Sequence, residues 1–535
     1  MATDKTSALV LRSSFVAALG GLLFGFDTAV ISGTIDSLKR VFALNEWQLG
    51  FTVASALIGT ILGAATIQFP SNKYGRKPTL IMIALLYLIS AIGSAFPWDW
   101  YSFLFFRFLG GIGVGGASVV SPLYTAEIAP PKRRGFLVAL TQFNIVLGIL
   151  VAYLSNYAID ACDLGDNSWR WMFGVEAIPA FVFLVALLAN PESPRWLTAQ
   201  GRTEDARRLL ARLVLDERAA DEELIAIQDS LEKERTAGKE RLFCKRYRKP
   251  ILLAIAIAAF NQLSGINTIM YYAPTVFKMA GASQQTAMFF PAIIGLTNLV
   301  FTMLALFCID RFGRKKLMYV GSIGYITSLI FVGFMFTKYS TEFGESIKRL
   351  EAESQAAAVA SENPETQTLD VASATTTASA LDPTREPTLE SVETPIAFDG
   401  SMASQIVEDD ANAAESASSA VPQAGILGVL AGLMVFIMAH AFGQGACIWV
   451  FISEIFPNGV RAQGNALGCF THWILNAVIA QLFPPFLKIV GPAAIFYTFA
   501  GFMILQLVWV AKEMPETKGV PLEDMMKKLG VDAAE

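Results

Sequence analysis

Apolar stretches of about 20 residues recur along almost the whole chain, and each has the length that a helix needs to cross a bilayer. Hydrophobic residues make up 54% of the sequence and charged residues only 16%, which is unlike a soluble globular protein. We expect twelve membrane-spanning helices, at roughly 13–35, 50–70, 78–97, 101–127, 136–159, 170–190, 252–275, 286–309, 317–337, 424–451, 463–486 and 492–512. The pattern predicts an all-α membrane protein.

The two halves of the chain repeat the same short motifs in the same order. Gly75-Arg76-Lys77 recurs as Gly313-Arg314-Lys315 after 238 residues, whereas Glu127-Ile128 recurs as Glu454-Ile455 after 327. Extra chain must therefore lie between the second copies of the two motifs, which begin at Gly313 and Glu454. Removing 338–422 makes the spacing nearly uniform. The core is predicted to be a duplicated unit, which gives two pseudo-symmetric six-helix bundles.

Five parts follow from this repeat. They are a first bundle at 13–190, a linker at 191–250, a second bundle at 251–337 and 423–512, an insertion at 338–422 and a cytoplasmic tail at 513–535. In the linker, Leu209, Leu213 and Leu224 recur at helical spacing among charges, which predicts short amphipathic cytoplasmic helices.

The insertion differs in composition from the rest of the chain. Between 339 and 422 it carries 16 acidic and 3 basic residues and few aromatic ones. Such a segment cannot bury enough apolar surface to fold by itself. We expect a disordered, solvated loop outside the cytoplasm; binding of a partner protein is the alternative role.

Basic residues in the short loops indicate the orientation of the chain. They gather at 73–77, 132–134 and 311–316. Short loops rich in Lys and Arg remain on the cytoplasmic side of a membrane. We expect a multi-pass protein of the cell (inner) membrane with both termini in the cytoplasm.

The sequence holds no evident motif for a cofactor. Its five cysteines and two histidines are scattered without metal-ligand spacing, and no Gly-x-x-x-x-Gly-Lys-Ser/Thr loop occurs. Gly111-x-Gly113-x-x-Gly116 fits the dinucleotide fingerprint, but it lies inside an apolar stretch, where close helix packing explains it better. We expect no cofactor, no metal, no nucleic-acid partner and no enzymatic activity, and we expect a monomer.

Five motifs together carry a family resemblance. They are Gly-Arg-Lys at 75–77 and at 313–315, Pro-Glu-Ser-Pro-Arg-Trp-Leu at 191–197, Gln-Leu-Ser-Gly-Ile-Asn at 262–267 and Pro-Glu-Thr-Lys-Gly at 515–519. With these motifs the chain resembles the sugar porter family of the major facilitator superfamily over its whole length outside the insertion. The first third is most similar to bacterial D-xylose–proton symporters. The resemblance implies the major facilitator fold and alternating access.

Three ionisable residues lie inside predicted spans of the first half. Asp27, Arg107 and Glu176 stand at similar depths, counted from the outer ends of their spans at 1.5 Å per residue. Because an isolated charge at such a depth is costly, we expect them to pair. A static ion pair is one interpretation; a proton switch centred on Asp27 is the other. The resemblance favours the switch, since proton-coupled sugar porters have Asp at this position and many uniporters have Asn.

A sugar site needs neutral groups that donate and accept hydrogen bonds, and an aromatic surface. The resemblance places such a site among Phe24, Gln142, Asn261, Gln262, Asn267, Tyr271, Tyr272, Asn298, Trp449, His472 and Asn476. Buried amides that only join helices are the alternative for any one of them. Asn261 stands where the family usually has Gln, and His472 stands where it has Gln or Asn, so the sugar is left open.

Charged residues recur in both halves near the predicted cytoplasmic ends of the spans. They are Arg76, Glu127, Arg134, Glu192 and Arg195 in the first half and Arg314, Glu454, Arg461 and Glu516 in the second. Solvated surface charge is one interpretation. The resemblance favours salt bridges between the bundles that stabilise an outward-open state.

Together these features predict a secondary active transporter that imports a neutral monosaccharide, a pentose or a hexose, with protons. A facilitative uniporter of sugars or polyols is the first alternative, and a sugar sensor the second. Proton coupling and uniport are not separated by the sequence.

Overall fold

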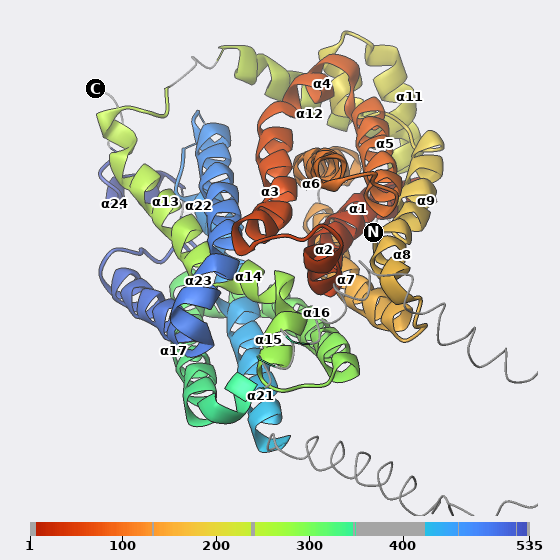
Figure 1. Ribbon diagram of the computed structural model, residues 1–535. Helices are drawn as coiled ribbons and strands as arrows, with labels where there is room; N and C mark the ends of the chain where they lie inside the picture. Colours follow the sequence, from red (N-terminus) through yellow and green to blue (C-terminus); the bar gives the residue numbers. More distant parts are fainter. Residues whose placement is uncertain are drawn as a thin grey trace, which may run out of the picture.

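The computed structural model describes residues 7–130, 133–236, 241–345, 348, 352, 423–457, 459–520 and 522–531. The first half of this chain contains α1 (Ala8–Val30), η1 (Ile31–Gly33), α2 (Ile35–Val41), α3 (Glu46–Thr66), α4 (Gln68–Tyr74), α5 (Arg76–Ala95), α6 (Trp100–Ile128), α7 (Arg134–Asp160), η2 (Gly165–Asn167), α8 (Ser168–Gly174) and α9 (Ala177–Leu188). Its helices form one bundle, drawn in red to yellow in Figure 1.

The second half forms the other bundle, in green to blue. It contains η3 (Lys245–Tyr247), α13 (Arg248–Leu263), α14 (Ile266–Tyr271), α15 (Ala273–Met279), α16 (Gln284–Phe312), α17 (Arg314–Lys338), α21 (Gln423–His440), the π-helical segment η4 (Ala441–Gly445), α22 (Ala446–Glu454) and α23 (Arg461–Lys512). The linker helices α10 (Pro194–Ala199), α11 (Thr203–Val214) and α12 (Glu217–Thr236) join the two halves, and α24 (Leu522–Lys528) follows the last span.

Within the described residues, 11 helical segments are long and apolar enough to cross a membrane. The last of them, α23, has 52 residues and is interrupted at Gly491, whose φ of 77° and ψ of 167° are not helical. This break divides α23 into two spans, so the described chain supplies the twelve crossings that the apolar stretches predict.

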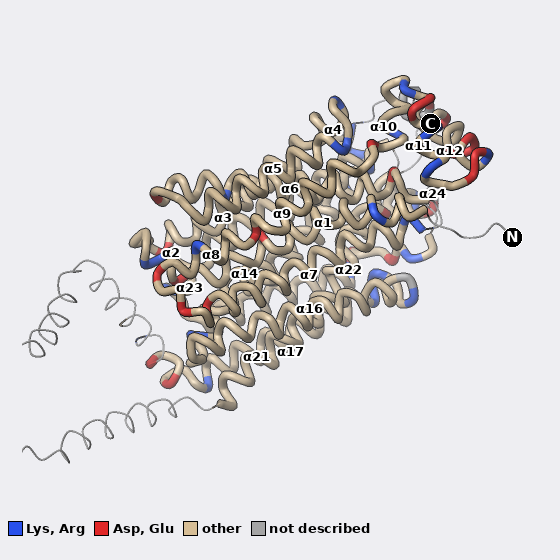
Figure 2. The backbone as a smooth tube through the Cα atoms, turned by 90° about the vertical axis from the view of Figure 1, so that its right-hand side faces the viewer, with Lys and Arg blue, Asp and Glu red and all other residues tan. Residues whose placement is uncertain are grey.

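Two ends of the bundle pair can be distinguished. We call the end that holds Gly75–Lys77 and Gly313–Lys315 the basic end. Figure 2 shows α4 and the linker helices at this end and α2 at the other, which we call the opposite end. The predicted amphipathic helices are present as α11 and α12, and Leu209, Leu213 and Leu224 are buried in the core of the first half.

The insertion begins later than the sequence predicts. The predicted insertion spans 338–422, but Phe343 is buried in the core and packs against Phe336 with ring centroids 5.2 Å apart. The helical core therefore continues past residue 337, because aromatic residues at 339 and 343 still face apolar neighbours. Residues 353–422 lie outside the described part of the chain, and with them the expected disorder of this loop.

Side-chain contacts hold the two halves together at the opposite end. Lys278 on α15 forms an ion pair with Asp36 on α2 at 2.5 Å. The Tyr153 hydroxyl of α7 donates to the Met270 carbonyl at 2.9 Å, and the Gln481 amide of α23 donates to the Trp47 carbonyl at 2.9 Å. This arrangement closes the opposite end around the centre of the molecule.

Candidate functional site

A break in the seventh span creates the centre of the site. Helix α13 ends at Leu263 and α14 begins at Ile266, with Gly265 between them at a φ of 82°. Glycine adopts this left-handed conformation without the steric cost that a side chain brings. An added Cβ at Gly265 would also lie 2.4 Å from the Phe499 ring. The break turns the polar residues before and after it toward one another.

Four predicted polar residues form one connected cluster in the second half. The Asn267 amide donates to Oε1 of Gln262 at 3.1 Å, and Nε2 of Gln262 donates to Oδ1 of Asn261 at 3.0 Å. The same Nε2 lies 3.1 Å from both ring nitrogens of His472 on α23. These groups offer donors and acceptors without a formal charge, as recognition of sugar hydroxyls requires.

Aromatic rings border this cluster. The His472 ring lies 5.2 Å from the Trp449 ring and 5.0 Å from the Trp473 ring, measured between centroids. Phe24 of α1 contacts Trp473 at 5.7 Å, which joins the two halves at this level. An apolar ring face next to hydrogen-bonding amides suits the C–H surface of a sugar.

The two neighbouring tyrosines have different partners. The Tyr271 hydroxyl accepts a hydrogen bond from Nδ2 of Asn476 at 3.0 Å, so both predicted residues adjoin the cluster. The Tyr272 hydroxyl donates to the Ala480 carbonyl at 3.3 Å, and its ring packs on Phe483. Tyr272 thus contributes to packing between α14 and α23.

Two predicted site residues stand apart from this hydrogen-bonded cluster. Asn298 on α16 is buried, and its Oδ1 accepts from Thr302 of the same helix at 3.2 Å. Gln142 on α7 is half-buried, and its side-chain amide has no hydrogen bond to another described residue. Gln142 is the one amide that we predicted for the site in the first half. Its donor and acceptor groups are free of bonds to other described side chains and can bind a ligand.

The three charged residues predicted to pair are buried in the first half. Nη1 of Arg107 on α6 lies 2.5 Å from Oδ1 of Asp27 on α1, and Nη2 donates to the Asp27 carbonyl at 3.2 Å. Glu176 interacts electrostatically with both, but its buried Oε1 has no hydrogen-bond partner among the residues that the structure describes. Asp27 and Glu176 are each 2% exposed and Arg107 is 3% exposed.

These charges do not balance when both carboxyl groups are ionised. Two carboxylates and one guanidinium leave one negative charge without a counterion in a buried place. An uncompensated buried charge costs several kcal/mol. A bound proton would restore neutrality, which makes this triad a chemically suitable site for a transported proton.

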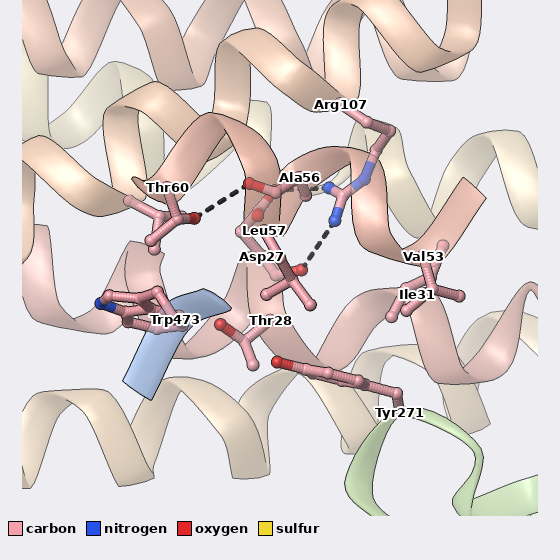
Figure 3. A pocket seen from close by; sticks show the side chains of 11 residues that line it. Asp27, Thr28, Ile31, Val53, Ala56, Leu57, Thr60, Arg107, Tyr271 and Trp473 are labelled. Carbon is pink, nitrogen blue, oxygen red and sulfur yellow. Dashed lines mark hydrogen bonds and ion pairs between the residues drawn. The ribbon is translucent and has the colours of Figure 1, made fainter. Parts of the chain in front are cut away.

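A small cavity lies between the triad and the other half. Asp27, Thr28 and Thr60 line it from the first half, and Tyr271 and Trp473 line it from the second. Figure 3 shows Tyr271 and Trp473 on the side of the cavity away from Arg107. The proton site therefore adjoins a space that is also lined by Tyr271, the partner of Asn476, and by Trp473, whose ring packs on His472 of the polar cluster.

Sequence reasoning missed Trp473, Thr28 and Thr60. Trp473 has a signal that could have found it. Tryptophan gathers at the ends of membrane spans, whereas residue 473 lies in the middle of a predicted one. The two threonines have no such signal, since threonine is common in membrane helices.

The charges at the basic end are arranged alike in the two halves. Arg76 forms a bidentate pair with Glu127, with both nitrogen–oxygen distances at 2.8 Å, and Arg314 lies 2.8 Å from Glu454. In the second half, Glu516 accepts from the backbone N–H of Arg314 at 3.0 Å. The two halves thus repeat the same network of charged side chains.

Glu192 takes the matching position in the first half. It accepts from the backbone N–H groups of Arg76 at 2.9 Å and of Lys77. Burial raises the pKa of Glu192 above its ordinary value, although these N–H groups act in the opposite direction. Glu192 and Glu516 therefore fasten the loop before each Gly-Arg-Lys helix.

The remaining charges contact nearby segments. Arg134 pairs with Glu223 of α12 at 3.8 Å, Arg195 donates to the Ser230 hydroxyl at 3.3 Å, and Arg461 donates to the Phe456 carbonyl at 3.3 Å. The sequence predicts salt bridges between the two bundles. The ion pairs described here lie instead within one half, or between one half and the linker. The reason is geometric, because the ion pair and the hydrogen bonds described above between the halves lie at the opposite end.

Two further features concern metal ligands and helix packing. Among the residues that the structure describes, no three His, Cys, Asp or Glu side chains meet as a metal site requires. An added Cβ at Gly111 would lie 1.9 Å from the Ala56 carbonyl oxygen. Gly111 therefore permits close packing of α6 on α3, as the sequence interpretation holds.

Known proteins match this chain over nearly its whole length. The family model described as "Sugar (and other) transporter" matches residues 13–352 and 412–529. The D-xylose-proton symporter of Escherichia coli (strain K12) is 34% identical, with 98% of this chain and 96% of that protein covered. The arabinose-proton symporter of Bacillus subtilis (strain 168) is 32% identical, with 98% and 96% covered.

A solved structure agrees in fold. The partially occluded inward-open conformation of the xylose transporter XylE from E. coli matches with a TM-score of 0.72 and 31% identity, covering 96% of this chain and 100% of that one. The predicted fold class and the resemblance are thereby confirmed. The chain belongs to the sugar (and other) transporter family of the major facilitator superfamily, and it is a multi-pass membrane sugar transporter, not an enzyme.

Proposed function

We propose that this transporter carries a neutral monosaccharide, a pentose or a hexose, together with a proton by alternating access. The observation that carries the proposal is the buried triad of Asp27, Arg107 and Glu176, which has one carboxyl group more than its guanidinium can neutralise. It adjoins a cavity that residues of the other half complete. A change in proton occupancy can therefore alter contacts between the halves.

The sugar binds at the polar cluster of the second half and at Gln142 of the first. Gln262, Asn267, Asn476 and His472 supply neutral hydrogen-bonding groups, and Trp449 supplies a ring face. The absence of formal charge among these groups suits a neutral substrate. The names of the relatives, which are symporters of D-xylose and of arabinose, support a monosaccharide coupled to protons.

The basic end faces the cytoplasm in this proposal. Its short loops carry Lys73, Lys77, Arg311 and Lys315, which fits the rule that basic loops stay inside. Because the halves are joined at the opposite end, the state described corresponds to an inward-facing step of the cycle. The salt bridges expected between the halves at the basic end belong to the outward-facing step.

Uptake into proteoliposomes tests the proposal. Purified protein is reconstituted, and uptake of radiolabelled D-xylose, L-arabinose, D-glucose and myo-inositol is followed with and without an inward proton gradient. We expect at least one of these sugars to accumulate above its equilibrium level only when the gradient is present. Gradient-independent equilibration of a sugar, without accumulation, would indicate a uniporter instead.

A further inference from the structure

Tyr271 occupies a position between the proton site and the polar cluster. It is the last residue of α14, the short helix that follows the break at Gly265, and it is 2% exposed. Its side chain comes from the second half, yet it lines the same cavity as Asp27 and Arg107 of the first (Figure 3). Tyr271 thus adjoins both sites while belonging to only one bundle.

The hydrogen bonds around Tyr271 determine where its own proton can go. Because the Tyr271 oxygen accepts from Nδ2 of Asn476, its O–H group must donate in another direction. Among the cavity-lining groups, Arg107 can only donate. The Thr28 and Thr60 hydroxyls donate to carbonyls of their own helices at 2.7 Å and 2.9 Å, so each is available to Tyr271 only as a neutral acceptor. The Asp27 carboxylate is the strongest acceptor that lines the cavity, since a charged acceptor strengthens a hydrogen bond.

Asn476 provides the connection to the sugar. Its Nδ2 is used by Tyr271, whereas its Oδ1 is buried and has no partner among the described residues. A buried unpaired amide oxygen is costly, and a sugar hydroxyl can satisfy it. Polarisation along a chain of hydrogen bonds strengthens each member. A hydroxyl bound at Oδ1 therefore strengthens the bond to Tyr271 and makes its O–H group a better donor.

We propose that Tyr271 is the positioning residue that links the proton on Asp27 to sugar binding at Asn476, directly or through one water molecule in the cavity. The inference rests on the proposed function, which requires the two events to be linked but does not say by which residue. Linkage of this kind is reciprocal, so proton occupancy of Asp27 and sugar affinity change each other by the same factor.

Other titratable groups also face Asp27. Arg107 comes from α6, Glu176 from the segment between α8 and α9, and Tyr87 from α5. All three belong to the first half. Tyr271 differs from them because it alone in this set comes from the bundle that holds Asn476.

The test compares the pH dependence of sugar affinity in two variants. Isothermal titration with D-xylose and with D-glucose gives the ratio of Kd values at alkaline and acidic pH for the wild type, Tyr271→Phe and Tyr153→Phe. Tyr153→Phe is the control, because it removes a buried hydroxyl between the halves that donates to the Met270 carbonyl and does not line the cavity. Coupling between two sites commonly amounts to about 5- to 150-fold.

We expect a ratio in this range for the wild type and Tyr153→Phe and a ratio near one for Tyr271→Phe. A full wild-type ratio in Tyr271→Phe would overturn the role of Tyr271 alone. A wild-type ratio of one, with no accumulation in proteoliposomes, would overturn proton coupling itself. Should Tyr271→Phe fail to fold, difluorotyrosine at 271 keeps the shape with a stronger donor, and the midpoint of the pH profile should move to lower pH. An unchanged midpoint would contradict the proposal.

Discussion

Gln262 is the residue at which most of the polar cluster meets. It bonds to Asn261 and Asn267 and approaches both nitrogens of His472. The sequence and the family resemblance predicted these residues as a set, but not which bonds join them. The bond partners depend on the turn at Gly265, and a local pattern does not specify the contacts between 262 and 472. The pairing of Asp27 with Arg107 was predictable, because depth along a helix follows from residue count alone.

We expect Gln262→Leu and Gln142→Leu each to weaken sugar binding. Removing an amide leaves sugar hydroxyls without partners at a cost of about 1–3 kcal/mol, which corresponds to roughly 5- to 150-fold in Kd. Isothermal titration on purified protein measures the change. Gln68→Leu is the control, since Gln68 is an exposed amide on α4. Unchanged affinity in both pocket variants would place the sugar site elsewhere.

At the level of helices, the apolar stretches predicted the number and order of the spans. They did not predict the breaks inside them. The π-helical segment η4 interrupts the tenth span. Within it Gln444 donates to Gln506 of α23, whose Nε2 donates to the Ser322 hydroxyl at 2.8 Å. All three side chains are buried. A glutamine in an apolar stretch predicts that it has a polar partner. The sequence does not identify the partner, because residues 322, 444 and 506 are far apart in the chain and meet only in the folded protein.

We expect Gln506→Leu to lower the midpoint of thermal unfolding in detergent. The substitution removes the partner of Gln444 and leaves its buried amide unsatisfied, which costs about 1–3 kcal/mol. The double variant Gln444→Leu/Gln506→Leu should recover part of the loss, because neither amide then remains unpaired. Equal losses that simply add in the double variant would show that the two amides act independently.

For the whole molecule, the repeated motifs predicted a duplicated core with a long insertion in its second half. The family match is interrupted between 352 and 412, within the predicted insertion. The predicted boundary at 338 was too early, because composition changes gradually there and Phe343 still packs in the core. The sequence also could not predict which charged residues pair with one another at the basic end. The ion pairs depend on the conformational state of the transporter, and the same sequence adopts every state.

We expect a deletion of 353–411 to leave sugar uptake largely unchanged, since these residues lie outside the matched core. A longer deletion of 342–418 also removes Phe343, and should lower thermal stability relative to the shorter one. Uptake into proteoliposomes and unfolding in detergent compare the two proteins. Loss of membrane insertion in the shorter deletion would show that the insertion contributes to folding.

In the proposed mechanism, Asp27 carries the proton that drives sugar accumulation. The most direct measurement is uptake into proteoliposomes by Asp27→Asn, with Asp166→Asn as a control that removes an exposed carboxylate paired with Arg40 of the same half. The amide keeps the size of the side chain but cannot exchange a proton. We predict that Asp27→Asn still exchanges sugar at equilibrium and no longer accumulates it under an inward proton gradient, while Asp166→Asn does both. Gradient-driven accumulation by Asp27→Asn at the wild-type level would contradict the account.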